Sequence, residues 1–190
     1  MKKIILASSS PRRKEIFAKI GIPFEVQESD YEEDMSVNLP AGELAEFLSA
    51  GKANAVAKMN PDAIVIAADT FVVYDGRPLG KPKTEERARE MLEMLSGKEH
   101  EIVTGVTIIE GRNVVSFHQE THVYMAVLSS AVIDAYIRTG EPLDKAGAYA
   151  LQEMGALLVE KIEGDFFNAM GLPLKRLVEE LRAFGVAVLG

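Results

Sequence analysis

The sequence predicts an α/β protein in which helices flank a mixed, twisted sheet. The apolar runs at 4–6 and 63–68 do not alternate with polar residues, which is typical of strands covered on both faces. Helical patterns lie between the extended segments, as in βα units. Two long segments, 102–109 and 114–128, are separated by the turn Glu110-Gly111-Arg112 and predict an antiparallel pair. Together, βα units and an antiparallel pair indicate a mixed sheet.

Length and composition predict one domain over residues 1–190, without repeats or linkers. The 190 residues can bury a full core, and 47% hydrophobic with 26% charged residues is ordinary for a globular protein. The formal net charge of −8 argues against a general affinity for nucleic acid or anionic membranes. The absence of cysteine excludes disulfides and thiolate metal sites. Because we find neither a membrane-spanning run nor a signal-peptide pattern, we expect a cytoplasmic protein.

The first helix is expected to begin at Pro11, shortly after the first strand. Ser10 is a natural N-cap, and Pro11 suits the first helical position because its missing N–H is not needed there. Arg12 and Arg13 then fall in the first turn, where cations are unfavourable by roughly 0.3–1 kcal/mol each. Backbone N–H groups, serine hydroxyls and two guanidinium groups at one place favour an anion site. A capped helix with solvated arginines is the alternative.

The remaining elements follow from apolar periodicity and turn residues. A short strand is expected at 24–27, and the acidic cluster at 30–34 is expected to be a solvated loop. In chain order we then expect a long helix after Pro40-Ala41-Gly42, a strand over 63–70, an extended segment over 71–74 before the turn Asp75-Gly76, a helix from Thr84 to Gly97, a helix from Ser129 to Gly140, a strand over 157–162, a loop over 164–168 and a closing helix over 174–184.

Two charged positions stand in otherwise apolar patterns. Lys52 falls within the apolar stripe of the long helix, so its side chain either snorkels to water or reaches a ligand. Asp69 and Thr70 directly follow the apolar run 63–68. In open α/β sheets, ligands gather at the carboxyl ends of strands. We therefore expect Asp69 to lie in a functional site.

Several common catalytic patterns are absent from the sequence. No stretch fits the Walker A or dinucleotide fingerprints, the three histidines form no metal-binding motif, and no nucleophile elbow occurs. What remains is a set of cations and carboxylates at element ends, in loops or in apolar stripes: Arg12, Arg13, Lys52, Lys81, Glu33 and Asp69. Cations that offset phosphate charge, and carboxylates that hold Mg²⁺ or Mn²⁺ or activate water, are the parts of phosphoanhydride hydrolysis.

Five groups of motifs occur in order along nearly the whole chain. They are Leu6-Ala7-Ser8-Ser9-Ser10-Pro11-Arg12-Arg13; Ala68-Asp69-Thr70; Gly80-Lys81-Pro82; Ser96-Gly97-Lys98-Glu99-His100-Glu101 with Thr104-Gly105-Val106; and Glu141-Pro142-Leu143-Asp144-Lys145-Ala146-Gly147-Ala148-Tyr149. In these motifs the sequence resembles the Maf family of nucleoside triphosphate pyrophosphatases. The resemblance implies a fold like that of inosine triphosphate pyrophosphatases, with two lobes around an active-site cleft. It also implies release of pyrophosphate from a nucleoside triphosphate, a divalent metal (Mg²⁺ or Mn²⁺) and a homodimer.

The resemblance further implies roles for single residues. Asp69 matches the proton acceptor of the family, and Glu33 and Asp69 match its metal-binding positions. The phosphate-binding positions correspond to Ser8, Arg12, Arg13, Lys52 and Lys81. Arg12, Thr70 and Gln152 match the specificity positions of the branch that acts on dTTP and UTP, and an amide can both donate to and accept from a uracil or thymine edge. Ala150-Leu151 departs from the more frequent Gly-Ile before Gln152.

Two alternatives to a dTTP and UTP pyrophosphatase stay open at this point. The chain could be a nucleotide-binding regulator of septum formation, the process from which the family takes its name, without essential catalysis. A pure binder needs no carboxylate facing the phosphates, so Asp69 favours the enzyme. The second alternative is the branch that prefers 7-methyl-GTP, which carries different groups at the three specificity positions.

Overall fold

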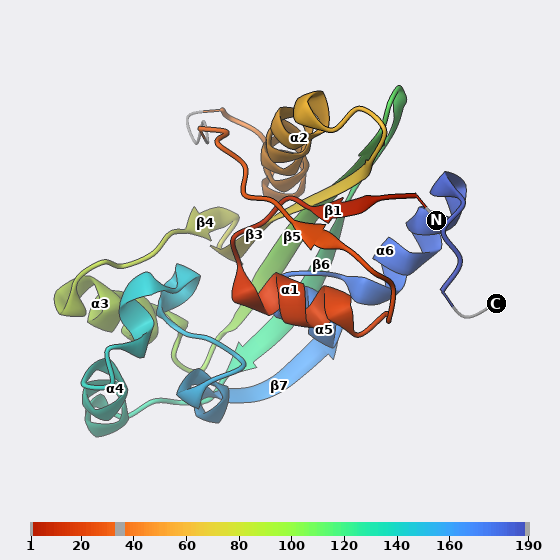
Figure 1. The fold of residues 1–190 in the computed structure, drawn as a ribbon. Helices are drawn as coiled ribbons and strands as arrows, with labels where there is room; N and C mark the ends of the chain where they lie inside the picture. Colours follow the sequence, from red (N-terminus) through yellow and green to blue (C-terminus); the bar gives the residue numbers. More distant parts are fainter. Residues whose placement is uncertain (1, 33–36, 189–190) are drawn as a thin grey trace. The chain divides into compact units, whose positions relative to one another are not determined.

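The computed structural model describes residues 2–32 and 37–188 (Figure 1). In chain order its elements are β1 Ile4–Leu6, α1 Pro11–Ala18, β2 Glu25–Val26, α2 Ala41–Met59, β3 Ile64–Tyr74, β4 Arg77–Leu79, α3 Glu85–Leu95, β5 Glu99–Glu110, β6 Asn113–Met125, α4 Ser130–Ile137, β7 Val159–Gly164, α5 Phe166–Ala169 and α6 Leu174–Leu181. Short 3-10 helices cover Glu141–Asp144, Ala146–Ala148, Met154–Leu158 and Arg182–Phe184.

Within the described ranges, seven strands form one mixed sheet, which confirms the predicted fold class. The strand order is β2-β1-β3-β5-β6-β7, and β4 pairs with β3. β1 runs parallel to both neighbours, with Leu6 opposite Val26 on one side and opposite Ile66 on the other. β6 and β7 are antiparallel, with Val123 opposite Ile162. β7 therefore forms one end of the sheet.

The last strand begins later than the sequence predicts. Residues Met154–Leu158 form a 3-10 helix, and β7 starts only at Val159. Gly155 lies in that helix, where a Cβ atom would meet the backbone oxygen of Ala150 at 2.6 Å. The backbone at Gly155 thus lies very close to that of Ala150. This tight fold suits the 3-10 helix and not an extended strand over 157–158.

The segment after Gly164 was expected to be a loop but contains the short helix α5. Its N-cap is Asp165, whose carboxylate accepts hydrogen bonds from the N–H of Phe167 at 2.8 Å and of Asn168 at 3.1 Å. A capping side chain can start a helical turn that periodicity over so few residues does not reveal.

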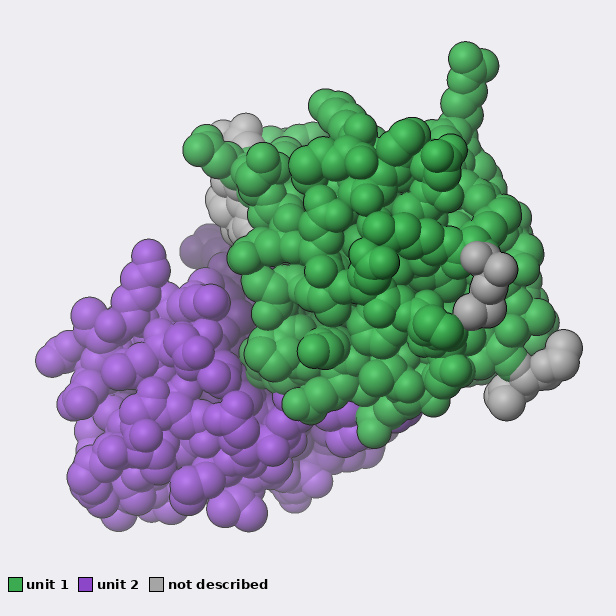
Figure 2. All heavy atoms as spheres, in the orientation of Figure 1, with its two compact units in different colours: residues 1–70, 104–119, 171–190 green, residues 71–103, 120–170 purple. Residues whose placement is uncertain are grey.

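The chain divides into two compact units (Figure 2). Unit 1 comprises residues 1–70, 104–119 and 171–190, and unit 2 comprises residues 71–103 and 120–170. In unit 1, a core cluster packs α2 against β1 and β3 through Ile5, Ala7, Ala53, Val56, Ala63, Val65, Ala67 and Ile109. In unit 2, a second cluster includes Ala88, Met91, Leu92 and Leu95 of α3 and Ile133, Tyr136 and Ile137 of α4. The single domain over 1–190 and the cleft between two lobes stay predictions.

Among the described residues, no helix is both long and apolar enough to cross a membrane.

Candidate functional site

The turn from β1 into α1 forms as the sequence predicts. Ser10 is the N-cap, and its hydroxyl accepts a hydrogen bond from the backbone N–H of Arg13 at 3.5 Å. Pro11 takes the first helical position. The hydroxyl of the buried Ser8 accepts the backbone N–H of Ser10 at 3.2 Å. Ser8 and Ser10 therefore fix the geometry at the positive end of the α1 dipole, where an anion is favoured.

Arg13 reaches from α1 to two other segments of unit 1. Its Nε donates a hydrogen bond to the carbonyl oxygen of Gly171 at 2.9 Å, and its Nη2 donates to Oγ1 of Thr70 at 2.9 Å. The alternative of a solvated arginine is therefore wrong for Arg13. Arg12, on the same first turn, is half-buried. Arg13 brings the start of α1 beside Thr70, the residue that follows Asp69.

Asp69 lies inside a strand rather than at its carboxyl end, which corrects the expectation from the sequence. β3 continues from Ile64 to Tyr74. The neighbouring parallel strand β1 is shorter, because it ends at Leu6, opposite Ile66. Asp69 therefore lies beyond the carboxyl end of β1 while still belonging to β3, and the chain that leaves β1 turns into α1 at this edge of the sheet.

Lys52 and Asp69 form an ion pair within unit 1. Lys52 Nζ of α2 donates to Asp69 Oδ1 of β3 at 2.5 Å, and the side chains are only 16% and 11% exposed. Burying a single charge is costly, and a partner of opposite sign at hydrogen-bond distance offsets that cost. The Lys52 side chain therefore does not extend into bulk water, and it already has a partner without a ligand. It holds the Asp69 carboxylate at a position with little access to water.

Thr104 belongs to one of the quoted motifs but is not among the candidate site residues, yet it contacts one of them. Its Oγ1 lies 3.0 Å from Thr70 Oγ1, and Thr104 is 0% exposed. Thr70 thus contacts Arg13 through one hydrogen bond and Thr104 through another. The signal that could have found it is a hydroxyl inside the apolar run at 102–109. The next residue, Gly105, lies so close to α2 that a Cβ atom would overlap the backbone of Ala45.

One described residue of the acidic cluster, Tyr31, packs against α2 of unit 1 instead of facing solvent alone. The ring of Tyr31 occupies the space where a Cβ atom of Gly51 would stand, so it packs directly on α2 one residue before Lys52. The backbone N–H of Tyr31 also donates to Ser29 Oγ at 3.2 Å. Glu33, the candidate metal ligand of this cluster, lies outside the described residues.

The candidates Lys81 and Gln152 belong to unit 2, and both are exposed. Lys81 follows Gly80, whose carbonyl oxygen accepts the N–H of Gly147 at 3.2 Å, so its loop is tied to the Glu141–Tyr149 motif. Gln152 Nε2 lies 3.3 Å from Met170 Sδ, in a weak donor contact. Both side chains are accessible to solvent, and their roles as ligand-binding residues stay predictions.

Two further motif residues form a buried pair in unit 2. His100 Nε2 and Tyr149 Oη are 2.6 Å apart, with their rings edge-to-face at 5.4 Å. Burial lowers the pKa of His100 to about 4 and raises the pKa of Tyr149 above its ordinary value. Both side chains are therefore neutral at pH 7, and the pair ties the start of β5 to the chain segment before Gln152.

The part of the chain that the structure describes holds no group of three or more histidine and carboxylate residues that could bind a metal ion. Among the candidate site residues it describes one carboxylate, Asp69, and the next residue in β3, Thr70, contacts Arg13 of the candidate anion site. Mg²⁺ is often bound by one or two carboxylates together with substrate phosphates, rather than by a cage of protein ligands. The described residues therefore fit an ion that binds together with a phosphorylated substrate.

Comparisons with known proteins find a matching family model and similar sequences over nearly the whole chain. The family model described as "Maf-like protein" matches residues 3–184. A protein of Bacillus cereus (strain ATCC 10987 / NRS 248) named dTTP/UTP pyrophosphatase is 48% identical over 188 residues, covering 99% of this chain and 93% of that protein. A protein of the same name from Bacillus pumilus (strain SAFR-032) is 46% identical over 186 residues, covering 98% of each.

Among solved structures, a HAM1 protein from Coxiella burnetii aligns with a TM-score of 0.55 at 14% identity, covering 96% of this chain and all of that one. A likeness at this identity concerns the fold. It shows a fold shared with that HAM1 protein, while the sequence relatives and the family model agree on the family itself. The chain belongs to the Maf family.

Proposed function

We propose that this chain is a nucleoside triphosphate pyrophosphatase that converts dTTP and UTP to the monophosphate and pyrophosphate. The observation that carries the proposal is the ion pair of Lys52 with Asp69, next to the contact of Arg13 with Thr70. A nearly buried carboxylate, followed in the strand by a threonine that Arg13 of α1 contacts, suits a reaction on an anionic substrate. The names and 46–48% identity of the Bacillus relatives support the substrate class.

The cations and hydroxyls of the site would bind the triphosphate. Ser8, the first N–H groups of α1 and Arg12 form one group of donors, and Lys81 in unit 2 is proposed to contribute a further cation. Arg13 is already bonded to Gly171 and Thr70, so its role would be to hold the β1–α1 turn and Thr70 in place as well as to supply positive charge. A preformed set of donors offsets the phosphate charge without rearrangement.

Asp69 would act as the general base of the hydrolysis. A water molecule attacks the α-phosphorus, its proton passes to an Asp69 carboxylate oxygen, and the bond to the bridging oxygen breaks to release pyrophosphate. The hydrogen bond from Lys52 holds the Asp69 carboxylate in one direction before the substrate arrives. A divalent cation bound with the triphosphate would neutralise phosphate charge and lower the pKa of bound water, with Asp69 and Glu33 as its proposed ligands.

The base would be selected by the three specificity positions. Thr70 and Gln152 offer a hydroxyl and an amide, which match the carbonyl and imide N–H groups of uracil and thymine. A purine such as 7-methylguanine leaves some of these polar groups unpaired, at a cost of roughly 1–3 kcal/mol for each. We therefore propose several-fold higher kcat/KM for UTP and dTTP than for 7-methyl-GTP. We also propose a cytoplasmic location and a homodimer.

The test is pyrophosphate release by wild type and Asp69→Asn over a panel of triphosphates. The substitution keeps the shape of the side chain and removes the base, so we expect turnover to fall by about 10² or more. Asp62→Asn is a matched control, because Asp62 is exposed in the turn before β3, and it should leave turnover unchanged. Circular dichroism and thermal melting verify the fold of both variants.

Two results would contradict the proposal. Near-normal turnover of a folded Asp69→Asn protein would remove Asp69 from the reaction. Nucleotide binding by the wild type without any pyrophosphate release would instead support the regulator of septum formation, and 7-methyl-GTP as the best substrate would assign the chain to the other branch.

A further inference from the structure

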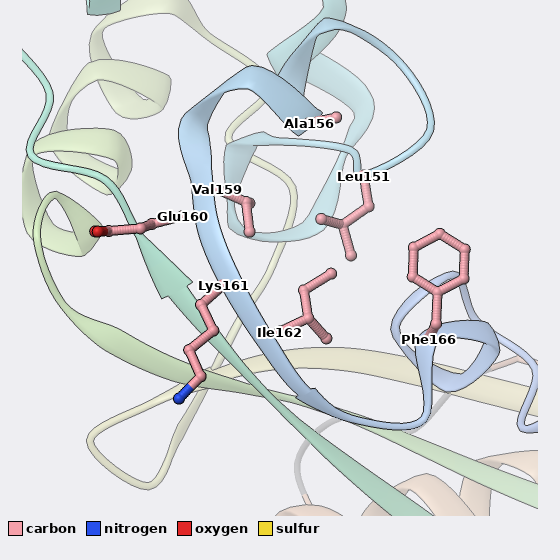
Figure 3. A pocket seen from close by; sticks show the side chains of 7 residues that line it. All are labelled: Leu151, Ala156, Val159, Glu160, Lys161, Ile162 and Phe166. Atoms are coloured by element: carbon pink, nitrogen blue, oxygen red, sulfur yellow. The ribbon is translucent and has the colours of Figure 1, made fainter.

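Apolar side chains gather on the surface of unit 2 next to β7. Met154, Leu157 and Phe166 are 53%, 79% and 52% exposed, which is unusual for large apolar side chains so close together in the chain. A pocket of about 290 Å³ in the same region is lined by Leu151, Ala156, Val159, Glu160, Lys161, Ile162 and Phe166. Figure 3 shows Leu151, Ile162 and Phe166 turned toward one another, whereas Glu160 and Lys161 point away. These apolar side chains form a surface patch beside β7. Among the residues that line its pocket only Glu160 and Lys161 are charged, and both lie at its border.

The patch includes the strand at the end of the sheet. β7 pairs with β6 on one side, and in the described part of the chain no strand pairs with its other side. The outer edge of such a strand presents backbone N–H and C=O groups to any extended partner, and proteins protect these edges with charges or cover them. The outer edge of β7 therefore offers hydrogen bonds directly beside exposed apolar surface.

The charges along β7 favour a partner identical to itself. When two copies of a strand pair antiparallel about a two-fold axis, opposite residues share one face, so the register is defined by the residue on the axis. With Ile162 on the axis, Lys161 of each copy stands opposite Glu163 of the other, and Glu160 stands opposite Gly164. Registers centred on Glu160, Lys161 or Glu163 would place two identical charges against each other. Of these four registers, only the one centred on Ile162 places no like charges opposite each other and joins Lys161 to Glu163.

Lys161 and Glu163 can take part in such a contact without losing their present partners. They form an ion pair with each other in the monomer, and their side chains are 57% and 49% exposed. Tyr124 Oη donates to Glu163 at 2.8 Å, and Lys161 Nζ lies 5.0 Å from the centre of the Tyr124 ring. These contacts hold both charges on one face of the strand. Ile162 points to the other face, toward the pocket (Figure 3).

We propose that the outer edge of β7, centred on Ile162, binds the same edge of a second copy of this chain. The pairing continues the sheet across a two-fold axis, joins Lys161 of each copy to Glu163 of the other, and covers the apolar side chains around Ile162 and Phe166. The interface uses no residue of the proposed catalytic site, so it can be tested independently of the proposed activity.

The experiment exchanges charges between the two positions. Lys161→Glu and Glu163→Lys, each alone, place like charges opposite each other, and we expect the dimer dissociation constant to rise at least tenfold. An equimolar mixture of the two variants restores opposite charges at both contacts and should dimerise again, as should the double variant Lys161→Glu/Glu163→Lys. Glu160→Lys is the matched control on the same strand. It faces Gly164 in the proposed register and should leave the dimer intact.

Masses are measured by light scattering after size exclusion and by analytical ultracentrifugation, against twice the chain mass of 20.8 kDa for a dimer. Thermal melting verifies that each variant is folded, and pyrophosphate release should stay at the wild-type level. If either single variant does not fold, Ile162→Lys, which puts two like charges on the axis, replaces it and should give monomers. A monomeric wild type, a mixture that stays monomeric, or equal disruption by Glu160→Lys would overturn the interface.

Discussion

Two of the lysine–carboxylate pairs among the described residues, one in each unit, differ in almost everything except their chemistry. Lys52 and Asp69 in unit 1 are 16% and 11% exposed and join α2 to β3. Lys161 and Glu163 in unit 2 are 57% and 49% exposed and lie two residues apart on β7. Water screens the second pair and leaves its partners exchangeable, whereas the first pair is fixed because either charge alone would be costly to bury.

This difference shows that the surroundings, rather than the ion pair itself, decide what the pair does. A buried pair holds a charge ready for chemistry and also contributes to the stability of the fold. An exposed pair contributes little to the fold, but it can recognise a second charged surface. Lys52→Met and Lys161→Met test this contrast directly, and changes at His100 and Thr104 extend it to other buried polar groups of the two units.

Removing the buried cation should have the largest effect. Lys52→Met keeps the apolar stem but leaves the Asp69 carboxylate nearly buried without its partner. We expect the free energy of unfolding to fall by about 3 kcal/mol, the range seen when one member of a buried pair is lost. Urea titration measures this change. Lys58→Met, at an exposed position later in α2, is the control and should have no such effect. Unchanged stability of Lys52→Met would mean that water already solvates Asp69.

The buried histidine of unit 2 should make stability depend on pH. Its pKa is lowered to about 4 in the folded chain, against 6.5 when unfolded. Its contribution is complete above pH 6.5, and it is lost as the pH falls toward 4 because the unfolded chain takes up the proton first. We expect about 2 kcal/mol less stability at pH 5 than at pH 8 from His100. His100→Gln does not titrate, so the same comparison should show a correspondingly smaller loss; an identical loss would exclude His100 as the cause.

The hydroxyl of Thr104 should contribute a smaller amount. Thr104→Val preserves the shape in β5 but removes the contact with Thr70, and a lost hydrogen bond of this kind costs about 1 kcal/mol. Because Thr70 would be less well oriented, kcat/KM for UTP should also fall. Thr104→Ser keeps the hydroxyl and is the matched control. Equal behaviour of the valine and serine variants, measured by melting and steady-state kinetics, would show that the contact is dispensable.

The smallest effect is expected at the exposed pair. Lys161→Met should leave the melting temperature of the monomer unchanged within error, because water already solvates both Lys161 and Glu163. Differential scanning fluorimetry at a protein concentration below the dimer dissociation constant isolates the monomer. A clear loss of monomer stability would mean that the two ion pairs are more alike than their exposures indicate.

Local signals in the sequence predicted local structure well. Ser10 and Pro11 specify their own turn, and the apolar runs specify the strands, because both depend on neighbours in the chain. The family motifs also pointed to Asp69 and Thr70. The partners of these residues were not predictable, since Lys52 is 17 positions away from Asp69 and Thr104 is 34 positions away from Thr70. Only the tertiary fold brings them together.

The errors in the prediction have a common physical origin. β3 extends past Asp69 because it continues to pair with β4 after β1 has ended, and periodicity does not report which neighbour a strand has. The late start of β7 and the helix α5 depend on the close contact at Gly155 and the cap at Asp165. Each is a single contact that outweighs the preference of the surrounding residues.

The glycine in β5 that touches α2 limits how this protein can change. A Cβ atom at position 105 would overlap backbone atoms of Ala45 and Glu46, and not their side chains. No substitution within α2 could make room, so a second-site suppressor of Gly105→Ala would have to move the whole helix. Such a shift would carry Lys52 with it, two turns further along α2, and away from Asp69. Selection for the charge pair should therefore also preserve the missing side chain at position 105.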